Sequence, residues 1–160
     1  MARYHGTANH IYMNGEFVPE AEAKVDVLSC AVKYGATVFE GLCGYLDDDG
    51  ELNVFRLPEH TMRLMQSMLL MRFRHDYTAQ SLGLVVLETL RANEVREDVH
   101  VRLSSFVEGR GFSTTVEPIG LACSISFRPD RSLEDKAARA AVSSWRRIDD
   151  ATMPPRIKCA

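Results

Sequence analysis

Residues 37–70 read TVFEGLCGYLDDDGELNVFRLPEHTMRLMQSMLL, and this stretch decides the fold class. Its first half has apolar runs at Thr37–Phe39 with Leu42–Leu46 and again at Leu52–Phe55, on either side of an acidic turn ending in Gly50. This order predicts two strands joined by a turn. Pro58 then stands where the first turn of a helix tolerates proline, and apolar residues follow at three- and four-residue steps. The stretch therefore predicts a strand–turn–strand unit followed at once by an amphipathic helix.

The segments on either side extend this prediction. Asn14-Gly15 lies between two short apolar runs, and it predicts a hairpin because both residues accept the positive φ angles of a type I′ turn. A second helix is predicted from Thr78 to Asn93. Further strands are predicted at Val99–Ser104, Ile119–Phe127 and Ala140–Trp145. Together, the strands and the two helices predict an α+β domain.

The composition is that of a folded domain. The 160 residues are 46% hydrophobic and 26% charged, which excludes a disordered tail or a low-complexity linker. There is no apolar run long enough to span a membrane, and the first residues lack the apolar core of a secretory signal. We therefore expect a cytoplasmic protein without a membrane partner. The net charge of −3 gives no reason to expect a nucleic-acid partner.

Thiol, metal and amine chemistry have few candidate residues. The four cysteines form no CxxC pair and are expected to be reduced, and the five histidines are scattered without metal-ligand spacing, so no metal is expected. Of the 19 basic residues, the lysines are Lys24, Lys33, Lys136 and Lys158. The remaining basic residues are arginines, which suit phosphate and carboxylate recognition but do not act as nucleophiles at neutral pH.

Two motifs add a resemblance to this pattern. Tyr34–Gly41, followed by Val54–Leu64, resembles the fold-type IV aminotransferases that use pyridoxal 5′-phosphate (PLP), and the branched-chain amino acid aminotransferases above all. Further similar segments are Val99–Arg102, Ser143–Arg146 and Pro154–Lys158, so the resemblance runs from about residue 10 to Lys158, the position of that family's Schiff-base lysine.

The resemblance implies a domain organisation. Residues 1–130 would form the small N-terminal domain of a two-domain enzyme, an antiparallel sheet with two helices. Residues 131–160 would be the connector and the first strand of the large, PLP-binding domain. The end of the chain, a double proline followed by Lys158, is unlike the close of a domain, and we interpret it as a truncation of that large domain.

The resemblance also implies roles for five residues. Lys158 would bind the aldehyde of PLP as a Schiff base and then move the proton at the substrate's α-carbon. Arg63 would bind the phosphate of PLP through its guanidinium fork. Tyr34 and Phe39 would line the pocket for the substrate side chain, and Arg102 would meet the second carboxylate of an acidic substrate.

For each of these residues the sequence also allows a purely structural role. Lys158 could be a solvated lysine near a frayed end, and Arg63 could lie on the helix surface and pair with Glu59. Tyr34 and Phe39 could pack in the core, and Arg102 fits the solvent-facing phase of a strand. Glu40 is expected to support the site without contacting the cofactor.

The implied function is PLP-dependent transamination between a branched-chain or hydrophobic amino acid and 2-oxoglutarate, in a homo-oligomer. D-amino acid transaminases, amine transaminases and aminodeoxychorismate lyases share the fold and remain alternatives, as does a non-catalytic oligomerisation module. Cys43 and His100 replace an arginine and a tyrosine of many branched-chain enzymes, and the connector 128–132 lacks their aromatic residue. Because the family binds its cofactor between two domains, we expect the isolated chain to be inactive.

Overall fold

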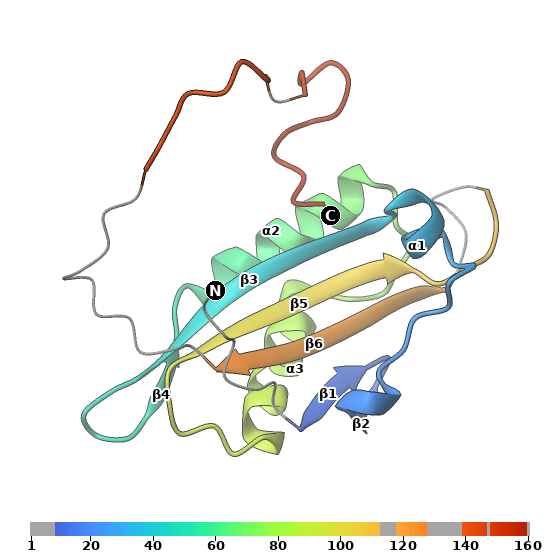
Figure 1. Ribbon diagram of the computed structural model, residues 1–160. Helices are drawn as coiled ribbons and strands as arrows, with labels where there is room; N and C mark the ends of the chain where they lie inside the picture. The colour runs from blue at the N-terminus through green and yellow to red at the C-terminus, as the bar shows by residue number, and fades with distance from the viewer. Residues whose placement is uncertain (1–8, 113–117, 128–138, 147, 160) are drawn as a thin grey trace.

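The computed structural model describes residues 9–112, 118–127, 139–146 and 148–159 (Figure 1). In this part of the chain, strands form one antiparallel sheet in the order β2-β1-β6-β5-β3-β4. The strands are β1 (His10–Met13), β2 (Glu16–Pro19), β3 (Thr37–Leu46), β4 (Leu52–Val54), β5 (Val99–Val107) and β6 (Ile119–Phe127). The helices are α1 (Cys30–Tyr34), α2 (Leu57–Leu70) and α3 (Ala79–Ala92), with a short 3-10 helix, η1 (Glu20–Glu22). The predicted α+β class is confirmed.

The turns follow from local chemistry. Asn14 and Gly15 have φ angles of 53° and 102°, as the hairpin prediction requires, and they join β1 to β2. The carboxylate of Asp47 accepts hydrogen bonds from the backbone N–H groups of Asp49 and Glu51, at 3.1 and 2.8 Å, and this closes the turn between β3 and β4. The two apolar runs predicted before this turn form one continuous strand.

Both predicted helices are confirmed. Pro58 lies in the first turn of α2, where a missing N–H group leaves no hydrogen bond unmade. Thr78 and Ser81 form a capping box at the start of α3, in which each side chain accepts a hydrogen bond from the other residue's backbone N–H.

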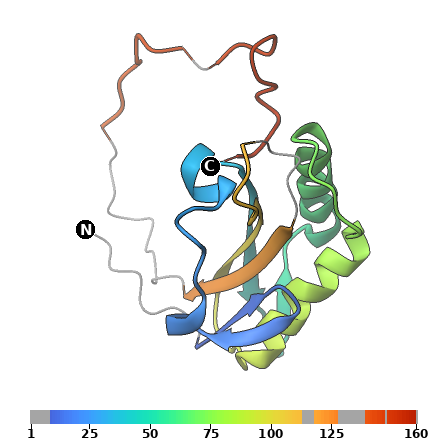
Figure 2. The same cartoon turned by 90° about the vertical axis from the view of Figure 1, so that its right-hand side faces the viewer.

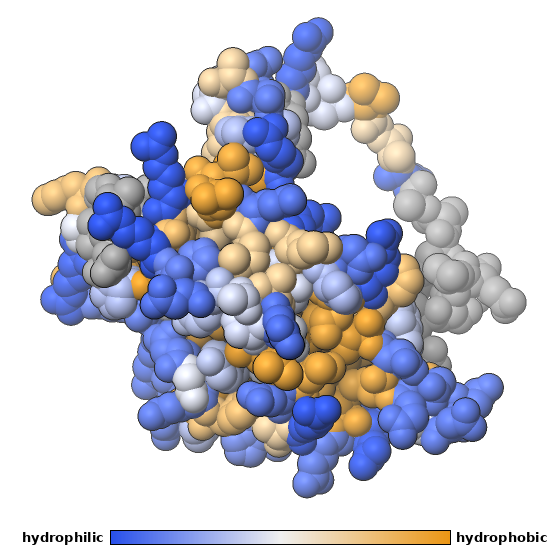
Figure 3. Space-filling view, turned by 180° about the vertical axis from the view of Figure 1, so that it is seen from behind, coloured by the Kyte–Doolittle hydropathy of each residue, from blue (hydrophilic) through white to orange (hydrophobic). Residues whose placement is uncertain are grey.

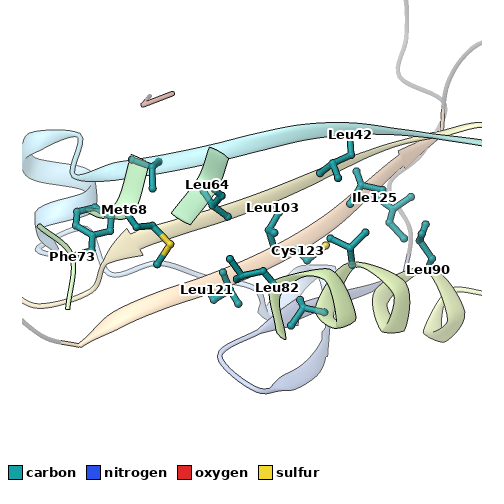
Figure 4. Close-up of a cluster of buried hydrophobic side chains, with 14 of the residues drawn as sticks. Leu42, Leu64, Met68, Phe73, Leu82, Leu90, Leu103, Leu121, Cys123 and Ile125 are labelled. Carbon is teal, nitrogen blue, oxygen red and sulfur yellow. The ribbon is translucent and has the colours of Figure 1, made fainter. Parts of the chain in front are cut away.

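The helices α2 and α3 cover one face of the sheet (Figure 2). Leu64 and Met68 of α2 and Leu82 of α3 are fully buried against Leu42 and Leu103 of the sheet, in the cluster drawn in Figure 4. Burying one such side chain contributes about 1.5–3 kcal/mol. This core fixes the orientation of α2 relative to β3, on which the site depends.

The other face of the sheet carries no long helix among the described residues. Side chains alternate along a strand, so Phe39 and Cys43 of β3 and His100, Arg102 and Ser104 of β5 share this face, which we call the open face. Behind the sheet, the helix layer shows apolar surface (Figure 3), including a groove of about 400 Å³ between α2 and α3.

Helix α1 and the segment Ala140–Trp145 differ from the sequence prediction. Helix α1 was not predicted, because five residues are too few for a periodic pattern; its signals are the caps, where Ser29 accepts from the N–H of Val32 and Gly35 has a φ of 64°. The predicted strand Ala140–Trp145 is wrong, because residues 139–146 form no strand. Nothing in the described part of the sheet pairs with this segment, and a strand needs a neighbour for its backbone groups.

The predicted connector 128–132 lies outside the described residues. Among the helices that the structure describes, none combines the length and the apolar character required to cross a membrane.

Candidate active site

Glu40 stands at the centre of a cluster of charged groups between β3 and α2. It shares the buried phase of β3 with Val38 and Leu42, and its side chain has no exposed surface. A carboxylate in such a position is tolerated only when donors surround it. The donors come from α2, where His60 and Arg63 are three residues apart and therefore lie on one side of the helix.

Arg63 makes a two-bond contact with Glu40. Its Nε donates to Oε1 and its Nη2 to Oε2, both at 2.6 Å. Arg63 does not pair with Glu59, as one sequence interpretation allowed; Glu59 instead contacts Arg56 at 3.0 Å on the surface of α2. The Arg63 side chain remains 47% exposed, so the guanidinium is half open to solvent although the carboxylate is enclosed.

His60 supplies another contact. Its Nδ1 lies 2.9 Å from Oε2 of Glu40 and 3.5 Å from Nη2 of Arg63. One nitrogen cannot both donate and accept in the same tautomer, and the shorter contact with a carboxylate requires a donor. We therefore assign the proton to Nδ1, which donates to Glu40, so the longer approach of Arg63 to His60 is not a hydrogen bond.

These contacts determine the protonation of Glu40. Burial by itself raises the pKa of a carboxyl group, but the hydrogen bonds from Arg63 and His60 and the charges of Arg63 and Lys158 outweigh burial and lower the pKa of Glu40. Conversely, the hydrogen bond to Glu40 raises the pKa of Arg63. The cluster therefore holds an ionised carboxylate and a permanent guanidinium cation.

Lys158 reaches the same cluster from the other end of the chain. Its Nζ lies 3.8 Å from Oε2 of Glu40, and its side chain is 35% exposed. The backbone is fixed on two sides, because the carbonyl of Lys158 accepts from the N–H of Phe39 at 2.9 Å and its N–H donates to Oγ of Ser67 at 3.3 Å. An isolated antiparallel β-bridge between the backbones of Val38 and Cys159 continues this contact along the edge of β3.

Phe39 connects Lys158 to Arg102. The Cζ atom of Arg102 lies 3.8 Å from the centre of the Phe39 ring, and Nζ of Lys158 lies 5.5 Å from it. Both are cation–π distances. Arg102 is on the exposed phase of β5, so the open face presents a cation stacked on an aromatic ring, next to the lysine amine.

Tyr34 is placed apart from this group. It ends α1 and is 53% exposed, with the amine of Lys33 5.1 Å from its ring centre. The contacts described above bring Lys158 and Arg63 to Glu40, and they bring Lys158 and Arg102 to Phe39. None of these contacts involves Tyr34. Gly35 and Ala36 separate it in sequence from the start of β3 at Thr37.

From the sequence, Glu40 was expected only to support the site, and His60 and Ser67 were assigned no role. Their signal is visible in hindsight, since Glu40 is a charged residue in the buried phase of an otherwise apolar strand. His60, Arg63 and Ser67 recur at three- and four-residue steps, which marks one polar stripe on α2. What the pattern could not supply was the partner of each group, because residues 40, 63 and 158 meet only in the folded chain.

Cys43 and His100, which the sequence resemblance marks as departures, lie on the open face. Cys43 is opposite His100 in the register of β3 and β5, and His100 leans over Gly41. A Cβ atom on Gly41 would lie 2.8 Å from Nε2 of His100, so glycine at this position makes room for the imidazole. Within the described residues there is no group of three or more histidine, cysteine or acidic side chains suited to a metal ion.

Comparison with known proteins gives a consistent set of relatives. A probable branched-chain-amino-acid aminotransferase of Aquifex aeolicus is 33% identical over 154 residues, which is 93% of this chain and 49% of that protein. The branched-chain-amino-acid aminotransferase of Escherichia coli K12 is 31% identical over 159 residues, covering 94% of this chain and 50% of the relative. No family model matches the sequence.

Solved structures agree with these relatives. The branched-chain aminotransferase from Thermoproteus uzoniensis with norvaline has a TM-score of 0.82 and 36% identity, and the match covers 96% of this chain and 52% of that one. The branched-chain amino acid aminotransferase from Thermobaculum terrenum in its PLP form has a TM-score of 0.77 and 32% identity, covering 95% and 50%. The chain therefore spans about half the length of the proteins that it matches.

Proposed function

We propose that this chain, which is similar in sequence and fold to the N-terminal half of the branched-chain aminotransferases, forms one wall of a PLP-dependent transaminase. The reaction exchanges an amino group between a branched-chain or other hydrophobic amino acid and 2-oxoglutarate. In this proposal the enzyme is a cytoplasmic homo-oligomer, residues 1–130 are its small domain, and residues 131–160 lead into the large one.

One observation carries the proposal. Lys158 and Arg63 are 95 positions apart in sequence numbering, yet Nζ of one and Nη2 of the other lie 3.8 and 2.6 Å from the same oxygen of Glu40. A primary amine next to a guanidinium suits a ligand that carries both an aldehyde and a phosphate. Arg63 also has donors to spare, since a guanidinium has five N–H groups and the contacts with Glu40 use two of them.

The residues of this chain divide the chemistry among themselves. When bound, PLP supplies the electron-withdrawing ring that stabilises negative charge at the substrate's α-carbon. Lys158 holds the aldehyde end and moves the proton at the α-carbon, and Arg63 binds the phosphate and resists displacement of the cofactor. The side chain of Lys158 is 35% exposed to solvent, so the other wall of the site has to exclude water from it.

The open face provides the substrate side. Phe39 offers an apolar surface to a hydrophobic side chain, and Arg102, stacked on that ring at 3.8 Å, is within reach of a second carboxylate. A transaminase that alternates between a hydrophobic amino acid and 2-oxoglutarate needs both features in one pocket. We place Tyr34 at the margin of this pocket.

A second candidate keeps the chemistry and changes the substrate. His100 and Cys43 bring a polar ring and a thiol to the part of the open face next to Arg102. This favours an enzyme of the same fold whose amino donor is more polar than valine or leucine. A donor panel of branched-chain L-amino acids, polar L-amino acids, D-amino acids and simple amines, each with 2-oxoglutarate, separates the two candidates.

The decisive experiment is Lys158→Ala in the full-length protein. We expect transamination to be lost, together with covalent labelling of the chain when PLP is reduced onto it with borohydride. Lys24→Ala is the matched control, because Lys24 is an exposed lysine outside the site, and it should retain both properties. Turnover at the wild-type rate in Lys158→Ala would overturn the assignment.

A further inference from the structure

We propose that Glu40 is a positioning residue that aims the guanidinium of Arg63 at the cofactor's phosphate. This inference rests on the proposed function, because it assumes that Arg63 is the phosphate ligand. Glu40 itself does not touch the cofactor in this proposal: it is fully buried, and its carboxylate oxygens are occupied by contacts with the protein.

The geometry of the pair carries the argument. A guanidinium is a rigid plane, so holding one edge of it determines where the other edge points. Glu40 holds the edge formed by Nε and Nη2 with two bonds of 2.6 Å. The donors of Nη1 and the second hydrogen of Nη2 are then left on the edge away from the carboxylate, and the side chain is 47% exposed on the way to solvent.

The carboxylate is itself held in place. His60 donates to Oε2 at 2.9 Å, and Lys158 lies 3.8 Å from the same oxygen. Glu40 is carried by the central part of β3, and His60 and Arg63 are carried by α2, whose Leu64 and Met68 are fully buried against the sheet. Groups on two packed elements keep their orientation better than groups on loops, and a pre-oriented donor binds its ligand with less loss of entropy.

The chain contains a matched control for this arrangement. Arg56 and Glu59 form a second arginine–glutamate pair at the start of α2, with a distance of 3.0 Å. Both side chains are exposed there, at 60% and 48%, so the pair has the same chemistry without the enclosed carboxylate. Glu59→Gln should therefore leave phosphate recognition unchanged.

The test compares the binding of PLP and of pyridoxal, which lacks the phosphate, to the cofactor-free full-length protein. The dissociation constant of pyridoxal divided by that of PLP measures phosphate recognition and does not require activity. Any effect that Glu40→Gln has on Lys158 acts on both ligands and cancels in the ratio. We expect the ratio to fall about tenfold in Glu40→Gln and by up to about 100-fold in Arg63→Ala, as expected for charge-assisted hydrogen bonds.

The double variant separates positioning from general stability. If Glu40 acts through Arg63, adding Glu40→Gln to Arg63→Ala should leave the ratio where Arg63→Ala alone put it. A further drop in the double variant, or an unchanged ratio in Glu40→Gln, would overturn the inference while leaving the proposed function standing. A wild-type ratio near one would overturn both, because Arg63 would then not bind phosphate.

A second variant covers the case in which Glu40→Gln does not fold. Arg63→Lys leaves the buried carboxylate untouched and keeps a positive charge, but it removes the planar fork that Glu40 orients. We expect the pyridoxal-to-PLP ratio of dissociation constants to fall at least about fivefold, because an ammonium group cannot be held on one edge and offer the other. A ratio equal to that of the wild type would contradict the inference.

Discussion

Glu40 links the stability of the fold to the chemistry of the site, because the carboxylate that orders Arg63 is also the most deeply buried charge described in the sheet. A buried ion pair contributes little over an apolar replacement, but removing one partner leaves an uncompensated charge and is costly. Glu40 therefore constrains the sequence around it: His60 and Arg63 cannot change independently of it.

The ionised state of Glu40 predicts how stability depends on pH. Its pKa in the folded protein is below the ordinary value of 4.5, so its contribution is fully present above pH 4.5 and is lost as the pH falls through the lower, folded value. We expect Glu40→Gln to be less stable than the wild type by roughly 3 kcal/mol at pH 7, with a gap that narrows as the pH falls below about 4.5. Thermal unfolding at a series of pH values measures this gap.

The control for this prediction is Glu59→Gln. Its partner Arg56 is on the surface, where salt and water screen the pair, so its loss should change the melting temperature little at any pH. If the difference in stability between the wild type and Glu40→Gln stays constant from neutral to acidic pH, the carboxylate does not titrate as the contacts require.

The cysteines allow a separate test of burial. Cys30 and Cys123 are fully buried, and burial raises the pKa of Cys123 to about 12, so neither thiol should react in the folded chain. Cys43 and Cys159 are partly exposed. We expect two thiols to react quickly with a disulfide reagent at mildly alkaline pH and the other two to react only in denaturant; peptide mapping that finds Cys123 among the fast pair would contradict the structure.

At the scale of single elements, the cap of α3 offers the clearest prediction. The hydroxyl of Thr78 accepts from the N–H of Ser81 at 3.0 Å and satisfies a group that has no partner within the helix. Thr78→Ala should lower the free energy of unfolding by about 1 kcal/mol, measured by urea denaturation. Thr152→Ala, at an exposed threonine outside the helices, should change it by less than about 0.5 kcal/mol.

The elements also show where sequence patterns suffice. Helices α2 and α3 were predictable because fourteen residues contain several turns of a periodic pattern, and the β1–β2 hairpin because Asn14-Gly15 specifies its turn. Helix α1 is too short for such a pattern, and the strand predicted at Ala140–Trp145 was wrong because strand formation depends on a partner that no local pattern reveals. The charge cluster could not be predicted for the same reason, since Glu40 and Lys158 meet only when the sheet folds.

For the whole molecule, the exposed apolar residues of segment 139–146 show that no described part of the chain covers it. Val142 and Trp145 are 102% and 90% exposed, whereas Ile157, a few residues later, packs against the core and is only 4% exposed. The chain thus packs against the sheet again at Ile157, next to Lys158, but segment 139–146 stays exposed. In the proposed enzyme, this segment would continue the wall of the site toward the other half.

This incompleteness predicts weak cofactor binding by the isolated 160-residue chain. A bound cofactor normally has most of its surface enclosed, whereas here the side chains of Lys158 and Arg63 are 35% and 47% exposed, and Phe39 and Arg102 lie on a face that no described helix covers. We expect PLP to bind at least about 100-fold more weakly than to a polypeptide of the relatives' length, because contacts from only one wall must offset the same loss of ligand freedom.

Equilibrium dialysis of both proteins measures the difference, and borohydride reduction followed by peptide mapping identifies the lysine involved. The Lys158→Ala form of the short chain corrects for PLP bound to surface lysines. Equal affinities in the two proteins, with the label on Lys158, would mean that residues 1–160 form a complete site.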